Sequence, residues 1–175
     1  VAKEWEKCRE VLGQAAGLNP QGADGAELYF RMGRVEAELD NAEGALEHYT
    51  KALEFDQNHA EALAAVEEAA RERKDWMEVA RLVHIKAKSA PDADSQLEFL
   101  CELGTLYAER LDPPEGGLPF LEQALQIAPD DPKVLKPLAD LYFAAGDLEK
   151  AEPMYIGLIE STTKTRKRSK ELAPY

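Results

Sequence analysis

The side chains that could carry out chemistry are few and scattered along the chain. A helical metal site needs two ligands four residues apart, because that spacing places them on one face of the helix. None of His48, His59 and His84 stands four residues from another histidine or from a cysteine. Cys8 and Cys101 also lack a metal-binding spacing, and each lies inside an apolar helical pattern, as reduced structural thiols do. We therefore predict no metal site and no cofactor.

Motifs that support catalysis are absent from the sequence. It contains neither a glycine-rich phosphate loop nor a serine in a nucleophile elbow. Adjacent carboxylates occur at Glu67-Glu68 and at Asp130-Asp131. The first pair fits a solvated helix face, and the second fits the start of a helix, where a carboxylate meets the helix dipole. We therefore predict no catalytic residues and no enzymatic activity.

The charge of the chain restricts its partners. Its 175 residues include 34 acidic and 21 basic side chains, giving a formal net charge of −13. Nucleic-acid binding requires a basic surface, so an acidic chain favours basic or neutral partners instead. The composition is typical of a soluble folded protein, and no apolar run is long enough to span a membrane. The unpaired cysteines are compatible with a reducing compartment such as the cytoplasm.

One basic cluster stands out against this acidic background. It lies near the end of the sequence and fits the exposed side of a loop and a helix start, although an acidic partner or membrane phosphate would also suit it. Its members are Lys164, Arg166, Lys167, Arg168 and Lys170.

Small and aromatic residues recur at fixed offsets in two parts of the sequence. Each series starts at a small residue. A second small residue follows twelve positions later, a tyrosine sixteen positions later, and a small or apolar residue nineteen positions later. The two series are Gly33, Ala45, Tyr49, Ala52 and Ala139, Ala151, Tyr155, Leu158. This spacing resembles the tetratricopeptide repeat (TPR), a helix–turn–helix unit of about 34 residues.

The resemblance implies an all-α fold, an α-solenoid of antiparallel helix pairs in a right-handed superhelix, with about ten helices. The repeats would be a half repeat at 1–22, full repeats at 26–59, 60–93, 97–131 and 132–161, and the start of another at 166–175. The apolar spacing predicts helices over 2–18, 23–38, 42–55, 59–73, 76–89, 94–110, 115–128, 132–145, 148–161 and 166–175. We expect the array to be an excerpt of a longer protein.

A longer period of 71 residues relates Trp5 to Trp76 and Gly33 to Gly104. It predicts loose connections between helices at 21–25 and 92–96, and a third at 162–168. Gly146 is expected to end one helix in a left-handed conformation.

Prolines interrupt three of the predicted helices. Pro119, Pro137 and Pro153 each fall about six residues inside a helix, where proline removes a backbone hydrogen bond.

The family resemblance also implies a binding surface, because the first helix of each repeat lines a concave groove that holds an extended or helical peptide. The groove positions are Glu27, Phe30, Arg31, Arg34 and Glu38; Glu61, Ala64, Glu68, Arg71 and Glu72; Glu98, Cys101, Glu102, Thr105 and Glu109; and Lys133, Lys136, Asp140 and Phe143. One subgroup of the family grips acidic chaperone tails with a clamp of Lys, Asn and Arg. Here the clamp positions hold Phe30, Arg34, Ala65, Glu98 and Glu102, so that function is not expected.

The predicted function is a protein-interaction scaffold for a partner protein or peptide of basic or amphipathic character. Two alternatives remain open: a structural array that self-associates through uncapped ends, and a regulatory segment of a larger enzyme.

Overall fold

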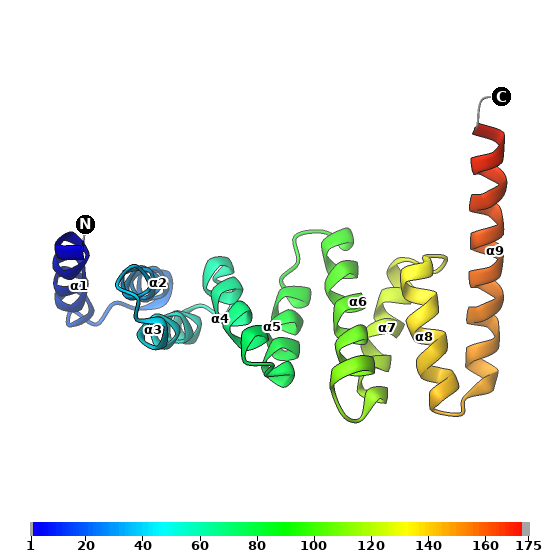
Figure 1. The fold of residues 1–175 in the computed structure, drawn as a ribbon, viewed down its shortest axis with the longest axis horizontal. Coiled ribbons are helices and arrows are strands. Elements are labelled where there is room, and N and C mark those ends of the chain that lie inside the picture. The colour runs from blue at the N-terminus through cyan, green and yellow to red at the C-terminus, as the bar shows by residue number, and fades with distance from the viewer. Residues whose placement is uncertain (1, 173–175) are drawn as a thin grey trace. The chain divides into compact units, whose positions relative to one another are not determined.

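The computed structural model describes the backbone of residues 2–172, and within that range every regular element is a helix (Figure 1). The prediction of an all-α fold of about ten helices is confirmed. The elements are α1 (Ala2–Ala16), α2 (Gly22–Glu38), α3 (Ala42–Phe55), α4 (Ala60–Glu72), α5 (Trp76–Lys88), α6 (Ala93–Arg110), the short 3-10 helix η1 (Pro114–Gly117), α7 (Leu118–Ile127), α8 (Pro132–Ala144) and α9 (Leu148–Leu172). No helix in the described range is both long and apolar enough to cross a bilayer.

The helices form two compact units. Unit 1 spans Val1–Ile85 and contains α1 to α4 and most of α5, whereas unit 2 spans Lys86–Tyr175 and contains α6 to α9. In unit 1, α1 packs on α2, α2 on α3 and α3 on α4, and in unit 2, α6 packs on α7, α7 on α8 and α8 on α9.

The core of unit 1 explains the spacing of small and aromatic residues. A Cβ atom added to Gly33 on α2 would lie 2.5 Å from the ring of Tyr49 on α3. The absence of a side chain at Gly33 therefore leaves room for the Tyr49 ring. The ring of Phe30 also packs against Tyr49, at a tilt of 37° and with its centre 5.5 Å from that of the tyrosine ring. These aromatic residues pack against a buried aliphatic cluster that includes Leu63 and Leu82.

Unit 2 repeats this arrangement with different residues. A Cβ atom added to Gly104 on α6 would lie 2.4 Å from Cγ of Leu121 on α7, and the Leu121 side chain is fully buried. Leu121 belongs to a cluster with Leu138 and Tyr142 of α8. The Tyr142 hydroxyl donates a 2.5 Å hydrogen bond to the Glu122 carboxylate. Burial, helped by Glu122, raises the pKa of Tyr142 well above its ordinary value.

Side chains cap several helix N-termini, as their sequence positions indicate. Asp131 accepts a 2.9 Å hydrogen bond from the Lys133 N–H at the start of α8, as predicted for the Asp130-Asp131 pair. Asn41 at α3 accepts from the Gly44 N–H and also donates to the largely buried Glu36 carboxylate. Gly146 has φ of +78°, which confirms the predicted left-handed end of α8.

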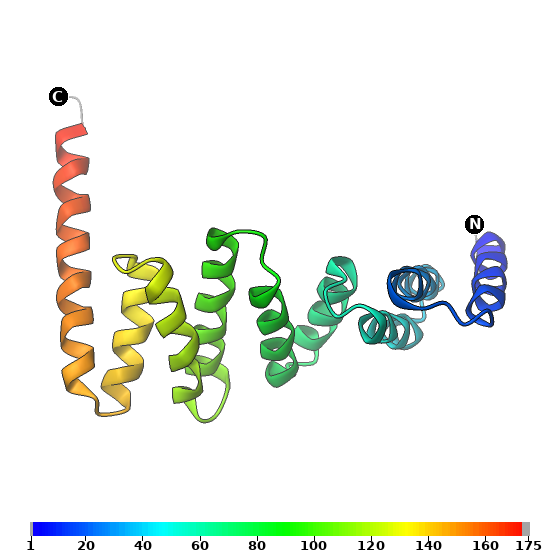
Figure 2. The same cartoon turned by 180° about the vertical axis from the view of Figure 1, so that it is seen from behind.

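The prediction for the C-terminal region was wrong in one respect. Instead of separate helices at 148–161 and 166–175 joined by a loose connection at 162–168, one helix runs over Leu148–Leu172 and extends beyond the level at which α8 begins (Figure 2). Residues 162–168 contain no glycine or proline, and lysine and arginine are good helix formers. Thr163 also donates its hydroxyl to the Ile159 carbonyl in the preceding turn. Residues 173–175 of the predicted last helix lie outside the described residues.

The predicted position of Pro119, about six residues inside a helix, was also wrong. Pro114–Gly117 forms a 3-10 helix and α7 begins only at Leu118, so Pro119 falls in the first turn of α7. A first-turn N–H has no helical acceptor, so proline there removes no hydrogen bond. Pro137 and Pro153 do lie inside α8 and α9, as predicted.

Candidate functional site

Unit 2 contains a hollow between α6 and α8, the first helices of two predicted repeats. Its volume is about 680 Å³, and the two helices are in direct contact. The hollow brings together seven of the predicted groove residues: Cys101, Glu102, Thr105, Glu109, Lys133, Lys136 and Asp140. The remaining residues of its lining are Ala108, Pro114, Pro132, Pro137, Leu141 and Ala144.

The two helices that line this hollow run in the same direction and end at the same level (Figures 1 and 2). Lys133 lies in the first turn of α8, and Glu109 lies in the last turn of α6. A basic side chain therefore stands at one end of the hollow and an acidic side chain at the other. Small and apolar residues such as Ala108 and Leu141 line the hollow along with them.

Asp140 organises the middle of the hollow. Its carboxylate accepts a 2.7 Å hydrogen bond from the Lys136 ammonium and a 2.8 Å bond from the Tyr155 hydroxyl of α9. The bond from Lys136 is the main reason that the pKa of Asp140 is lowered. Lys136 and Asp140 thus balance each other's charge and hold each other's side chain on this surface.

Cys101 is half-buried in the same hollow, and burial raises the pKa of its thiol, with a further contribution from Asp131. A reactive cysteine requires a lowered pKa, because the thiolate is the nucleophile. Thr105, one turn later, donates its hydroxyl to the Cys101 carbonyl oxygen at 3.0 Å. The arrangement suits contact with a ligand rather than covalent chemistry.

A second hollow lies in unit 1 between α1 and α2, with a volume of about 350 Å³. Five of its lining residues belong to the predicted groove: Glu27, Phe30, Arg31, Arg34 and Glu38. The other three are Trp5 and Leu12 of α1 and Val35 of α2.

The rim of this hollow carries both signs of charge. The Arg31 Nε donates a 2.5 Å hydrogen bond to Glu27, and this bond lowers the pKa of the Glu27 carboxyl. Arg34 is exposed beside them. The apolar wall, which includes the half-buried Trp5 and Phe30, gives the hollow room for a hydrophobic side chain.

His59 contacts two residues of this hollow, although it was not among the predicted groove residues. Its Nδ1 accepts a 3.3 Å hydrogen bond from the Ala62 N–H and so caps α4. Its Nε2 lies 3.5 Å from Glu27, and its ring centre lies 4.9 Å from that of Phe30. The sequence signal was its position immediately before an alanine-rich helix, but the contacts with α2 depend on tertiary packing.

Seven predicted groove residues lie apart from both hollows, and one of them, Glu72, is exposed at the end of α4. Ala64 and Glu68 are exposed on α4, and Arg71 is bound to Glu67 with its Nη2 2.7 Å from the Glu67 carboxylate. Glu61 lies 3.6 Å from the His59 ring. Glu98 and Phe143 are exposed on α6 and α8 but do not belong to the lining of the unit 2 hollow.

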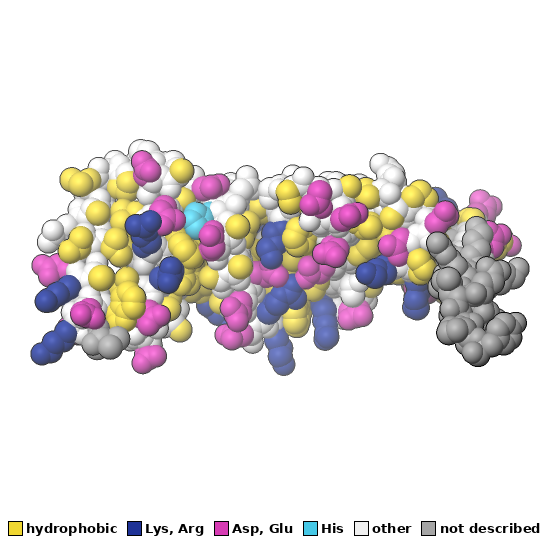
Figure 3. Space-filling view, turned by 90° about the horizontal axis from the view of Figure 1, so that it is seen from above, with side chains coloured by type: hydrophobic (Ala, Val, Ile, Leu, Met, Phe, Trp, Pro, Cys, Tyr) yellow, Lys and Arg dark blue, Asp and Glu magenta, His cyan; other side chains and the backbone are white. Residues whose placement is uncertain are grey.

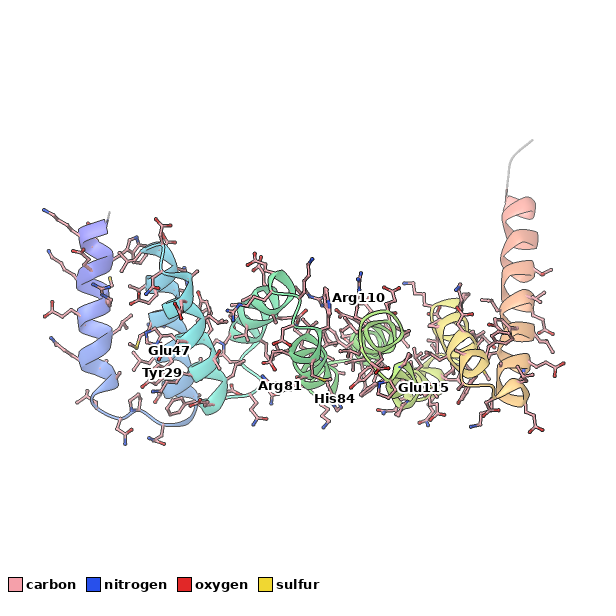
Figure 4. All side chains as sticks on the ribbon, turned by 60° about the horizontal axis from the view of Figure 1, so that its bottom comes forward. Tyr29, Glu47, Arg81, His84, Arg110 and Glu115 are labelled. Atoms are coloured by element: carbon pink, nitrogen blue, oxygen red, sulfur yellow. The ribbon has the colours of Figure 1, made fainter. Side chains whose placement is uncertain are left out.

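A third hollow, of about 870 Å³, lies along α3 and the end of α4 and was not predicted. Glu47, which is labelled in Figure 4, and Lys51 of α3 contribute to it. The Lys51 ammonium lies 4.9 Å from the ring centre of Tyr29. Because a second helix supplies most of its lining, this hollow is not part of the predicted first-helix surface.

The charged side chains on the face shown in Figure 3 are mixed in sign and do not form a patch of one charge. Acidic and basic side chains there are interspersed among apolar ones (Figure 3). Among the residues that the structure describes, no three His, Cys, Asp or Glu side chains are grouped in a way that could hold a metal ion.

Two family models, both described as the tetratricopeptide repeat, match residues 26–59 and 114–171, which together make up more than half of the chain. The chain belongs to the tetratricopeptide-repeat family. TPR proteins are generally protein-interaction scaffolds. No curated protein matched the sequence.

Solved TPR structures resemble the chain in fold. The MamA RS-1 ArsTM double mutant is 20% identical, with a TM-score of 0.54 over 92% of this chain and 86% of that one. YrrB, described as a TPR protein with an unusual peptide-binding site, is 20% identical, with a TM-score of 0.53 over 87% and 75% of the two chains. A crystal structure of MamA is 16% identical, with a TM-score of 0.53 over 94% and 92%. At these identities the likeness shows the fold alone.

Proposed function

We propose that this TPR chain is a protein-interaction scaffold that holds a peptide segment of a partner protein in the hollow between α6 and α8. The observation that carries the proposal is the meeting of Cys101, Thr105, Lys133, Lys136 and Asp140 in one hollow formed by two first helices. The description of YrrB as a TPR protein with a peptide-binding site supports a peptide as the class of ligand.

The lining favours an amphipathic peptide. Alanine, proline and leucine side chains offer apolar contact, while Glu102 and Glu109 favour basic groups and Lys133 favours acidic ones. The hollow in unit 1 offers a separate apolar contact through Trp5 and Phe30. In this role the chain has no catalytic activity, and its residues act by shape and charge.

The test is a selection of binding peptides from a random library, followed by affinity measurements on two matched variants. Thr105→Arg places a long side chain in the hollow, whereas Gln126→Arg makes the same change of charge at an exposed position of α7 outside the lining. Peptides selected on the wild-type chain should bind Thr105→Arg about tenfold more weakly, as expected for the loss of a central contact. They should bind Gln126→Arg as well as they bind the wild type.

Two outcomes contradict the proposal. Either the library yields no binding peptide, or the selected peptides bind Thr105→Arg with wild-type affinity. The thermal unfolding of both variants shows whether the fold has been kept.

Self-association is the second candidate, and exposed apolar side chains on α1, just after α1 and on α9 support it. Val11 and Leu18 are 62% and 84% exposed, and Ile156 is 50% exposed. Light scattering over a concentration series tests this function, since a constant monomeric mass at high concentration excludes it. A mass that rises with concentration, and that falls back in an Ile156→Glu variant, supports it.

A further inference from the structure

We propose that the ligand of the unit 2 hollow is an extended peptide segment with an acidic group at one end and a basic group about five residues away. The inference rests on the proposed function and adds the conformation, length and charge pattern of the ligand. Three features of the hollow carry it: a basic end, an acidic end, and a backbone carbonyl group without its helical partner.

Lys133 provides the basic end. It is exposed in the first turn of α8, and no carboxylate in the described part of the chain forms an ion pair with its ammonium group. The nearby Asp131 carboxylate is engaged as the helix cap by the Lys133 backbone N–H. Lys136, by contrast, is bound to Asp140. Lys133 is therefore the cation of this hollow that is available to a ligand carboxylate.

Glu109 provides the acidic end. It is exposed in the last turn of α6 and, within the described residues, has no basic partner. Because α6 and α8 run in the same direction and end level with each other, Glu109 lies at the opposite end of the hollow from Lys133 (Figure 1). A ligand that satisfies both side chains must carry opposite charges at its two ends.

The separation of these ends sets the length of the ligand. From Lys133 to Ala144 at the end of α8, eleven steps of helix rise about 16 Å in total. An extended chain advances about 3.3 Å per residue, so about five residues span the same distance.

Pro137 distinguishes an extended ligand from a helical one. Proline has no N–H, so the carbonyl oxygen of Lys133, four residues earlier in α8, lacks its helical hydrogen-bond donor. Lys133 and Pro137 both line the hollow, so this stretch of the α8 backbone borders the space that a ligand would occupy. An extended peptide has backbone N–H groups to donate to it, whereas those of a helical peptide are bound within the helix.

The experiment uses defined peptides, so it does not depend on knowing the natural partner. The probes are acetyl-Asp-Ala-Leu-Ala-Ala-Lys-amide, its reversed sequence, and a version with glutamine at both charged positions, each labelled for fluorescence anisotropy with the full chain. At least one of the dipolar probes should bind about tenfold more tightly than the glutamine version, as expected for one or two charge-assisted contacts.

Variants of the chain then assign the charges. In Lys133→Glu, the dipolar probe should no longer bind more tightly than the glutamine version. In the double variant Lys133→Glu with Glu109→Lys, one of the two dipolar sequences should again bind more tightly than the glutamine version. Lys88→Glu, at the exposed end of α5 and outside the lining, makes the same charge change and should leave the advantage intact. Equal binding of dipolar and glutamine probes, or an advantage that persists in Lys133→Glu, would overturn the charge pattern.

Pro137→Ala tests the conformation of the ligand. Restoring the helical N–H should weaken the binding of the dipolar probe by about three- to tenfold. The melting temperature of the variant shows whether the chain is folded. Tighter binding of a helix-constrained probe of the same sequence would overturn the assignment of an extended ligand. If the peptide library yields ligands that Thr105→Arg blocks but the dipolar probes have no advantage, this inference fails and the proposed function stands. If no peptide binds, both fail.

Discussion

The contact between Gly104 and Leu121 gives the sharpest prediction about stability. Replacing Gly104 with alanine would place a Cβ atom 2.4 to 2.8 Å from three side-chain carbons of Leu121. Leu121 is fully buried at 0% exposure, so it has little room to move aside. Overpacking of this kind costs about 1–3 kcal/mol. The better helix propensity of alanine offsets about 0.5–1 kcal/mol of that cost, so we expect a net loss of about 1–2 kcal/mol.

The assay is urea unfolding followed by far-UV circular dichroism. Gly13→Ala is the matched control, because nothing lies within 4 Å of a Cβ atom added at Gly13 in α1. This control should gain about 0.5–1 kcal/mol from helix propensity alone. The same chemical change should therefore shift the free energy of unfolding in opposite directions at the two positions.

A double-mutant cycle separates the steric clash from other effects. Leu121→Ala alone should cost about 2–5 kcal/mol through the cavity that it leaves. Because that cavity accommodates the new methyl group, adding Gly104→Ala to it should cost nothing further, giving a coupling free energy of about 1–2 kcal/mol. The reasoning about close helix approach would be refuted if Gly104→Ala proved as stable as the wild type and the two changes were additive.

Three further predictions concern particular contacts. Asn41→Ala removes both the cap of α3 and the 2.7 Å hydrogen bond to the buried Glu36 carboxylate, so it should cost about 1.5–3 kcal/mol in urea unfolding; a loss below about 0.5 kcal/mol would contradict this account. Tyr142→Phe removes the hydrogen bond to Glu122 and should cost about 1 kcal/mol at neutral pH. Folding raises the pKa of Tyr142, so the contribution of its protonated hydroxyl to stability is complete below the unfolded pKa of about 10 and is lost as the pH rises above that value. In alkaline unfolding titrations, the stability of the wild type should therefore fall more steeply with pH than that of Tyr142→Phe. Phe143→Ser changes a residue that is 61% exposed and outside the hollow, so it should alter stability by less than about 0.5 kcal/mol and leave peptide affinity unchanged; a large loss of affinity would move the site toward the end of α8.

Much of the fold could be predicted because small and aromatic residues mark where helices meet. The offset from Gly33 to Tyr49 corresponds to a direct packing contact between α2 and α3. The sequence did not predict the continuous α9, because the 71-residue period suggested a connection at 162–168. Local helix propensity, in a stretch without glycine or proline, proved to be the stronger determinant.

The candidate site was partly predictable for the same reason. Helical periodicity places Cys101 and Thr105 on one face of α6, and Lys136 and Asp140 on one face of α8, so their presence in one lining follows once these two helices are neighbours. The contribution of Pro114 depends on the 3-10 helix between α6 and α7, which the apolar pattern did not reveal. The contact of His59 with Glu27, by contrast, had no signal in the sequence spacing.

The most direct test of the peptide site is an NMR titration of the isotope-labelled chain with a peptide selected on the wild type. A ligand in the unit 2 hollow should produce saturable shifts at backbone amides on the facing sides of α6 and α8, around Thr105 and Asp140, and these shifts should disappear in Thr105→Arg. Saturable shifts confined to α7 and α9, or shifts that persist unchanged in Thr105→Arg, would contradict the account.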